Sequence, residues 1–227
     1  MGNYPEFEKA QEFLRSHLAG AHASDAAKRY RFEHSLRVAR IGRMVANKAF
    51  LDSDLLELGC LLHDIGKFDA EQPVDHGRAG ALVVREWFTA EGFSGPAADE
   101  VLQGIAMHVD GLFNPREDAQ GSAHDAAGRP YMLFDRVPGP VAVSIGDCDN
   151  IDRFGSYRIA DTLNYVQFMD KSTEEQREFI ANYLDNLRGF YDYECSTDAA
   201  QEMWIDRLDF QQEYFMRLLS EVGTVGL

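Results

Sequence analysis

The chain has 227 residues, of which 45% are hydrophobic and 26% are charged, and its formal net charge is −16. This composition is typical of a globular protein with a buried core, and the acidic surplus argues against binding of DNA or long RNA, which needs clustered cations. No apolar run approaches the roughly 20 residues of a membrane-spanning helix, and the first residues lack the basic and apolar segments of a secretory signal. We therefore expect a cytoplasmic protein that binds neither a nucleic-acid polymer nor a membrane, with its three widely spaced cysteines reduced.

Apolar residues recur with the α-helical period of about 3.6 residues along most of the chain, whereas strand-like alternation is nearly absent. The pattern predicts an all-α fold with helices at residues 5–19, 25–48, 53–63, 77–91, 96–108, 139–152, 157–168, 173–192 and 197–222. Ser172 and Glu175 predict a capping box at the start of a late helix. The long irregular stretch 110–138 could contain a small hairpin that turns near Gly128, with residues 131–134 as one strand.

Polar residues occupy the apolar faces of several predicted helices. His34 lies four residues before Val38, so the two side chains share one buried face. In the next helix the doublet His63-Asp64 follows a run of leucines, and Gly66 is expected to end the helix at its C′ position. A buried ionised carboxylate costs on the order of several kcal/mol unless a cation pairs with it.

Three further positions show the same conflict. His108 shares a helical face with Ile105, Asp147 lies four residues after Val143, and His76 precedes a helix rich in small residues. Each residue alone is commonly explained by a hydrogen bond, a cap or an ion pair, but one or two divalent metals would explain all of them together. Imidazole and carboxylate ligands suit Mn, Fe, Co, Ni or Zn, with Mg as a less suited candidate.

The ordered set His34, His63-Asp64 and Asp147 resembles the H…HD…D signature of the HD superfamily of metal-dependent phosphohydrolases. The segments RFEHSLRVARIG and LLHDIGK resemble its first two motifs, and DHGRAGA and IAMH resemble the additional histidine motifs of dinuclear members. The segment SIGDCDNIDRFGSYRIADTL is similar to one found in a branch of small bacterial HD hydrolases. The resemblance covers roughly residues 25–222.

The resemblance implies a helical bundle that forms one HD-type domain over residues 1–227. Its core would lie at roughly 25–168, with C-terminal helices at 170–222 packed on it. An exposed part of the aromatic residues in these late helices could form a homodimer interface.

The resemblance also implies two adjacent metal positions. The ligands of the first would be His34, His63, Asp64 and Asp147. Asp64 has two carboxylate oxygens and could bridge to a second metal, which His76 and His108 would complete.

The implied activity is hydrolysis of a phosphate ester of a small molecule, such as a nucleotide or a dinucleotide, by attack of a metal-bound hydroxide. The implied catalytic residues are Asp64, which orients the nucleophile, and Lys67, whose ammonium offsets phosphate charge. Lys67, Arg153 and Arg158 are candidate substrate-binding residues, although Arg153 stands where this branch of the family usually has a small residue.

Two other functions remain open for the same residues. Some HD relatives use a di-iron pair for oxygenation, and a non-catalytic nucleotide-sensing HD module would retain the fold. Lys67 beside the doublet favours hydrolysis, and the intact ligand set argues against a relic site. The sequence does not distinguish phosphomonoester from phosphodiester cleavage.

Overall fold

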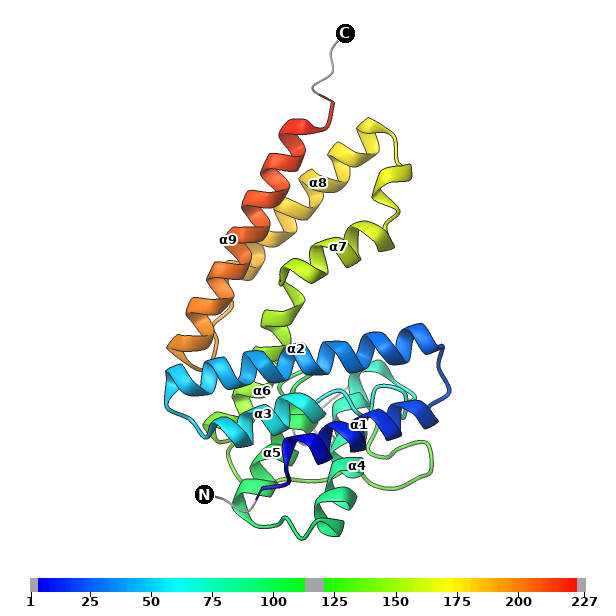
Figure 1. The fold of residues 1–227 in the computed structure, drawn as a ribbon, viewed down its shortest axis with the longest axis vertical. Coiled ribbons are helices and arrows are strands. Elements are labelled where there is room, and N and C mark those ends of the chain that lie inside the picture. Colours follow the sequence, from blue (N-terminus) through cyan, green and yellow to red (C-terminus); the bar gives the residue numbers. More distant parts are fainter. Residues whose placement is uncertain (1–3, 113–120, 224–227) are drawn as a thin grey trace. The chain divides into compact units, whose positions relative to one another are not determined.

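The computed structural model describes residues 4–112 and 121–223, and these residues form helices and connecting turns without a strand (Figure 1). The α-helices are α1 (Phe7–Gly20), α2 (Asp25–Ala49), α3 (Ser53–Leu62), α4 (His76–Ala90), α5 (Pro96–Met107), α6 (Pro140–Arg153), α7 (Ser156–Tyr165), α8 (Thr173–Arg188) and α9 (Asp198–Glu221). Short 3-10 segments are Pro73–Asp75, Phe168–Asp170 and Gly189–Asp192. The predicted all-α fold is confirmed. The described helices carry no stretch long and apolar enough to cross a membrane.

The chain divides into two compact units, residues 1–149 and residues 150–227. The sequence predicted a core that extends to about residue 168 and therefore includes α7. In the structure α7 belongs to the second unit, together with α8 and α9. The prediction of one domain over the whole chain is not tested by this division and stays a prediction.

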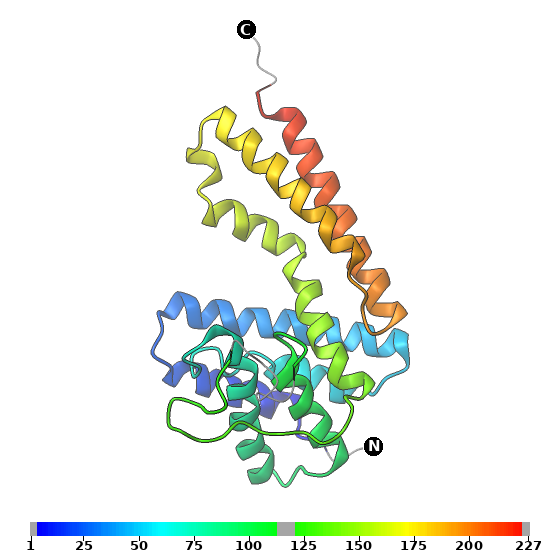
Figure 2. The same ribbon diagram turned by 180° about the vertical axis from the view of Figure 1, so that it is seen from behind.

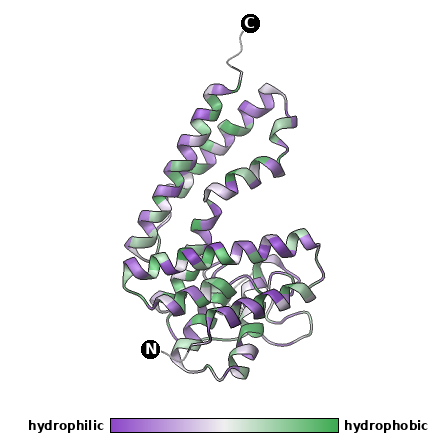
Figure 3. Cartoon of the chain, in the orientation of Figure 1, coloured by the Kyte–Doolittle hydropathy of each residue, from purple (hydrophilic) through white to green (hydrophobic). Residues whose placement is uncertain are grey.

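The first unit is built around α3. Every residue of this helix from Leu55 to Leu62 is buried, because α1, α2 and α5 all contact it, and α4 packs in turn on α5. Side-chain caps begin both α2 and α3: the side chain of Ser24 accepts a hydrogen bond from the backbone of α2, and that of Asp52 accepts one from the backbone of α3. Figure 3 shows hydrophobic residues concentrated on α3 and on the sides of its neighbours. The polar residues of α3 and its following turn are therefore placed in a water-poor region.

The second unit contains α7, α8 and α9, with α8 and α9 side by side and antiparallel (Figure 2). The predicted capping box is present: Ser172 accepts from the backbone of Glu175, whose side chain accepts from the backbone of Ser172. Ile180 and Phe215 are fully buried between the helices. Phe168, Trp204 and Phe215 are buried, whereas Tyr165, Phe210 and Tyr214 are exposed, and the predicted homodimer stays a prediction.

The stretch 110–138 forms a turn but no strand among its described residues, and residues 113–120 lie outside the described part of the chain. The backbone N–H of Asp125 donates to the carbonyl of Arg129 at 2.9 Å, and a single antiparallel bridge joins His124 to Pro130. The predicted turn near Gly128 is confirmed, but the predicted strand at residues 131–134 is wrong. Tyr131 is buried instead by packing against α4.

Candidate metal centre

The doublet His63-Asp64 lies in a tight turn directly after α3, with both residues buried. Gly66 follows, but α3 already ends at Leu62 with His63 as its C-cap, so the expectation that Gly66 is the C′ residue is wrong. A Cβ at Gly66 would collide with the backbone nitrogen of Gly80 and the carbonyl oxygen of His76. Glycine is needed here because the turn packs directly against the backbone of α4.

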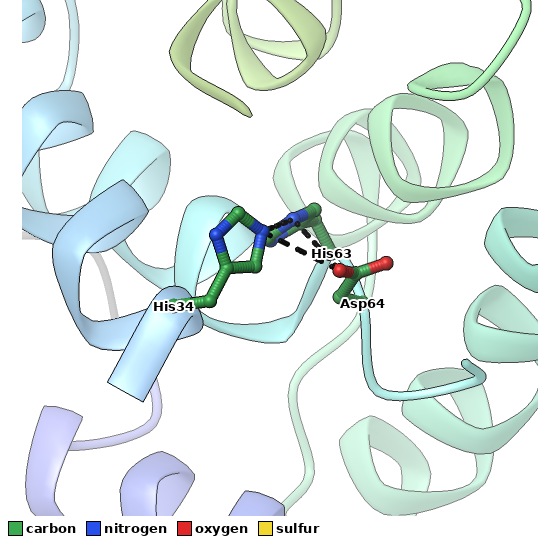
Figure 4. Close-up of side chains that lie close together, drawn as sticks. All are labelled: His34, His63 and Asp64. Atoms are coloured by element: carbon green, nitrogen blue, oxygen red, sulfur yellow. Dashed lines mark hydrogen bonds and ion pairs between the residues drawn. The ribbon is translucent and has the colours of Figure 1, made fainter. Parts of the chain in front are cut away.

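The fold brings six ligand-type side chains from five parts of the chain into one cluster. The cluster contains three groups of three residues: His34–His63–Asp64, His63–His108–Asp149 and Asp64–His76–His108. In each group, one oxygen or nitrogen atom of every residue lies within 4.8 Å of those of the other two. Figure 4 shows the rings of His34 and His63 and the carboxylate of Asp64 facing one another. His34 Nε2 lies 3.2 Å from His63 Nε2 and 3.4 Å from Asp64 Oδ2. The five residues of the predicted set other than Asp147 are therefore brought together.

The aspartate that α6 contributes to this cluster is Asp149, and Asp147 is in none of the groups. Asp149 Oδ1 lies 3.0 Å from His34 Nε2 and 3.5 Å from His63 Nε2. The two aspartates are two residues apart and so point about 200° apart around the helix. Ile145, one turn before Asp149, packs directly against Gly59 in α3 and Gly104 in α5. A Cβ at either glycine would collide with the Ile145 side chain. The structure therefore places Asp149, and not the predicted Asp147, in this cluster, on the helical face that meets α3 and α5.

The tautomers of three histidines follow from their backbone contacts. Nδ1 of His63 lies 2.7 Å from the carbonyl of Cys60, that of His76 lies 2.5 Å from the carbonyl of Pro73, and that of His108 lies 2.8 Å from the carbonyl of Ile105. A carbonyl only accepts, so each Nδ1 carries the hydrogen and each Nε2 of a neutral ring has a lone pair. Such an arrangement is usual for histidines that bind metal through Nε2.

These lone pairs face one another without a donor between them. Nε2 of His76 lies 3.2 Å from Nε2 of His108 and 2.8 Å from Oδ1 of Asp64. That carboxylate oxygen is buried and accepts no hydrogen bond among the described residues. Three acceptors directed at one point repel one another unless a cation lies there, so this donor set fits a divalent metal.

Burial favours the neutral imidazole, which is the form that binds metal. It lowers the pKa of His63 to about 3 and, with the charge of nearby Lys67 and the neighbouring His108, that of His76 to about 2. Burial likewise lowers the pKa of His108. Burial alone would raise the pKa of the Asp149 carboxyl. The hydrogen bonds from the imidazoles of His34 and His63 outweigh this effect and hold that pKa well below its usual range. At neutral pH His63, His76 and His108 therefore offer neutral imidazoles, and Asp149 offers an ionised carboxylate.

Two cations stand beside the cluster. Arg31, one turn before His34 in α2, forms an ion pair with Oδ2 of Asp64. Lys67 is half-buried, and burial together with the charge of Arg31 lowers its pKa to about 8. Sequence analysis identified Lys67 but missed Arg31, which the three-residue spacing to His34 could have indicated.

A buried ion-pair network joins the segments that carry His76 and His108. The guanidinium of Arg78 donates to Asp75 Oδ1 at 2.9 Å and to Asp110 Oδ2 at 2.8 Å. Asp75 precedes His76, and Asp110 lies two residues after His108. Asp75 Oδ2 also accepts from the backbone of Ser122 at 2.8 Å. Arg78, a residue that sequence analysis missed, thus fixes both histidine-bearing segments.

The other two predicted substrate-binding residues, Arg153 and Arg158, belong to the second unit, where both line a cavity. Arg158 Nη1 donates to Asp161 Oδ2 at 2.9 Å. Their predicted role stays a prediction.

The family model of the HD domain matches residues 31–153, more than half of the chain, and the chain therefore belongs to the HD domain family. A crystal structure of a predicted HD superfamily hydrolase from an uncultured Thermotogales bacterium is similar over 98% of this chain and 97% of its own, with 20% identity and a TM-score of 0.63. The HD domain of the L. monocytogenes phosphodiesterase PgpH, in complex with cyclic-di-AMP, matches over 97% of this chain and 99% of its own, with 17% identity and a TM-score of 0.40. No curated protein sequence matches. The family membership and the helical fold that the resemblance implied are confirmed.

Proposed function

We propose that this protein is a metal-dependent hydrolase that cleaves a phosphate ester of a small molecule, with a nucleotide or a dinucleotide as the favoured substrate class. One observation carries the metal dependence: Nε2 of His76, Nε2 of His108 and Oδ1 of Asp64 converge as three acceptors around one buried point. Membership of the HD domain family supports the same assignment.

The chain's residues divide into two sets of ligands that share Asp64. His34, His63 and Asp149 would hold one metal with Asp64, and His76 and His108 would hold a second. When bound, one or two divalent metals of the Mn, Fe, Co, Ni or Zn type activate a water molecule and offset charge on a phosphate oxygen. Asp64, with one oxygen directed at each set, would orient the nucleophile.

The cations beside the cluster favour a phosphorylated substrate. Arg31 forms an ion pair with the carboxylate that joins the two ligand sets, and the charge of Lys67 acts on His76 and His108. A guanidinium or an ammonium there can bind phosphate oxygens and stabilise charge that develops on them. Because Lys67 is half-buried, its interaction with an anion is screened less than that of a surface lysine. Oxygenation by a di-iron pair would not need these two cations.

The experiment is a screen of nucleotides, dinucleotides and sugar phosphates with the purified protein and added Mn, Co, Ni or Mg, paired with elemental analysis. We expect metal-dependent phosphate-ester cleavage that a chelator removes and that Asp64→Ala abolishes. Asp69→Asn is the matched control in the same turn, because Asp69 pairs with His17 near the surface. Full activity in a metal-free sample would contradict the proposal, and oxygen consumption without hydrolysis would favour the oxygenase.

Three further predictions accompany the proposal. If Arg153 and Arg158 bind the substrate, their replacement by glutamine should raise KM with little change in kcat. A cytoplasmic location and a homodimer are the expected setting, and fractionation and light scattering test them.

A further inference from the structure

The segments that carry His76 and His108 touch each other through main-chain atoms. A Cβ at Gly77, the residue after His76, would lie 2.6 Å from the carbonyl oxygen of Ile105 and 3.0 Å from Nδ1 of His108. The same carbonyl oxygen accepts the Nδ1–H of His108. The first turn of α4 therefore packs against the atoms that orient the His108 ring. The position of α4 along the end of α5 sets the distance between the two Nε2 atoms, which is 3.2 Å.

The side chain of Arg78 holds α4 in this position, because it crosses from α4 to the turn that follows α5. Its Nη1 donates to Oδ1 of Asp75 at 2.9 Å, and its Nη2 donates to Oδ2 of Asp110 at 2.8 Å. The other carboxylate oxygen of Asp110 accepts the backbone N–H of Leu112 at 2.9 Å, so this turn is fixed as well. Because Arg78 is buried, water screens its charge-assisted hydrogen bonds only weakly.

The histidines and the aspartate that belong to the first ligand set alone lie on other elements. His34 is in α2, Asp149 is in α6, and His63 follows α3. Nδ1 of His63 takes its orientation from the carbonyl of Cys60, within α3 itself. A disturbance of the Arg78–Asp110 pair should therefore act on the second ligand set and leave the first in place.

We propose that Arg78 and Asp110 are positioning residues for the second metal position. Their ion pair holds His76 and His108 at the spacing that one divalent ion needs, and it decides whether the centre binds two ions or one. This inference rests on the proposed metal dependence and extends it to two residues outside both ligand sets. Loss of an outer partner of a metal-binding histidine typically weakens metal binding about ten- to a hundredfold.

The test is a calorimetric titration of the chelator-treated full chain with Zn²⁺, with elemental analysis of the saturated protein after gel filtration. We expect two binding steps in the parent, and His76→Ala identifies the step of the second position as the one that it removes. Asp110→Asn and Arg78→Met, each studied well below its melting temperature, should weaken that step about ten- to a hundredfold. They should change the other step by less than about threefold.

The two variants separate position from charge. Asp110→Asn removes a negative charge and Arg78→Met removes a positive one, so a purely electrostatic effect would change the Zn²⁺ affinity in opposite directions. A positional effect weakens binding in both. Glu100→Gln is the matched control in α5 and should retain both steps. Glu100 is 18% exposed, lies 3.6 Å from Arg136 and accepts the backbone N–H of Val141 at 3.0 Å, at the other end of the helix.

Four results would overturn the inference. These are two unchanged steps in Asp110→Asn, opposite changes in Asp110→Asn and Arg78→Met, equal weakening in Glu100→Gln, and a parent that binds a single ion. The last result would leave metal-dependent hydrolysis intact. A parent that binds no ion would instead contradict the proposed function, and this inference with it.

Discussion

Replacing Arg78 by methionine tests whether the buried ion-pair network stabilises the first unit. Arg78 and Asp75 are each about 1% exposed, and Asp110 is 19% exposed. Methionine fills a similar volume but leaves two carboxylates without their shared cation. Breaking a buried pair by removing one partner costs about 3–5 kcal/mol, a large part of the roughly 5–15 kcal/mol that stabilises a typical domain.

The loss should appear as a lower melting temperature. At about 2–4 °C per kcal/mol for a unit of this size, we expect a decrease of roughly 6–20 °C. Circular dichroism follows the whole chain, and emission from Trp87 reports on α4, the helix that carries Arg78. Arg129→Gln is the control, because Arg129 is 53% exposed and its pairs with Asp125 and Glu86 should contribute at most about 1 kcal/mol.

A second variant separates charge from shape. Asp75→Asn in the Arg78→Met background removes one uncompensated charge and should recover part of the lost stability. A melting temperature for Arg78→Met within about 2 °C of the parent, less than 1 kcal/mol on the same scale, would refute the reasoning, because it would mean that the carboxylates need no buried cation.

Three other variants test the site. Asp149→Asn should weaken metal binding roughly ten- to a hundredfold or more, whereas Asp147→Asn should retain it. Elemental analysis and metal titration measure both variants, and weaker metal binding by Asp147→Asn than by Asp149→Asn would reject Asp149 as a ligand. The kcat/KM of phosphate-ester cleavage should fall as pH rises through about 8, where Lys67 loses its proton, and Lys67→Arg should extend activity to higher pH; identical profiles would exclude this role. Gly66→Ala should destabilise the protein by about 1–3 kcal/mol because its Cβ collides with the backbone of α4, while Gly20→Ala, which meets no atom within 4 Å, should not; equal melting temperatures would contradict the close packing.

The helices and most of the histidine cluster could be predicted because their signals are local. Apolar periodicity located the helices, and a histidine on an apolar face, such as His34, conflicts with its surroundings whatever the tertiary fold. Ser172 and Glu175 form a capping box from their spacing alone. These features need only the geometry of one helix.

The remaining features depend on which surfaces meet. Asp147 and Asp149 both have apolar residues one turn away along α6. Only the contact of Ile145 with α3 and α5 shows that the face of α6 with Asp149 is the one turned toward the cluster. Arg78 reaches Asp110 across a separation of 32 residues, which periodicity cannot detect. Tyr131 lies in a short apolar run that fits a strand or a buried loop equally well, and packing on α4 decided for the loop.

The backbone contact between the turn at Gly66 and the start of α4 has a consequence for motion. Two segments that touch through main-chain atoms, with no flexible side chain between them, cannot shift independently by even a fraction of an ångström. The conformational entropy of arranging Asp64 opposite His76 is therefore lost when the chain folds and not when an ion arrives. An incoming cation meets a rigid receptor, and amide hydrogens around Gly66 and Gly80 should exchange with solvent only through large-scale opening of the first unit.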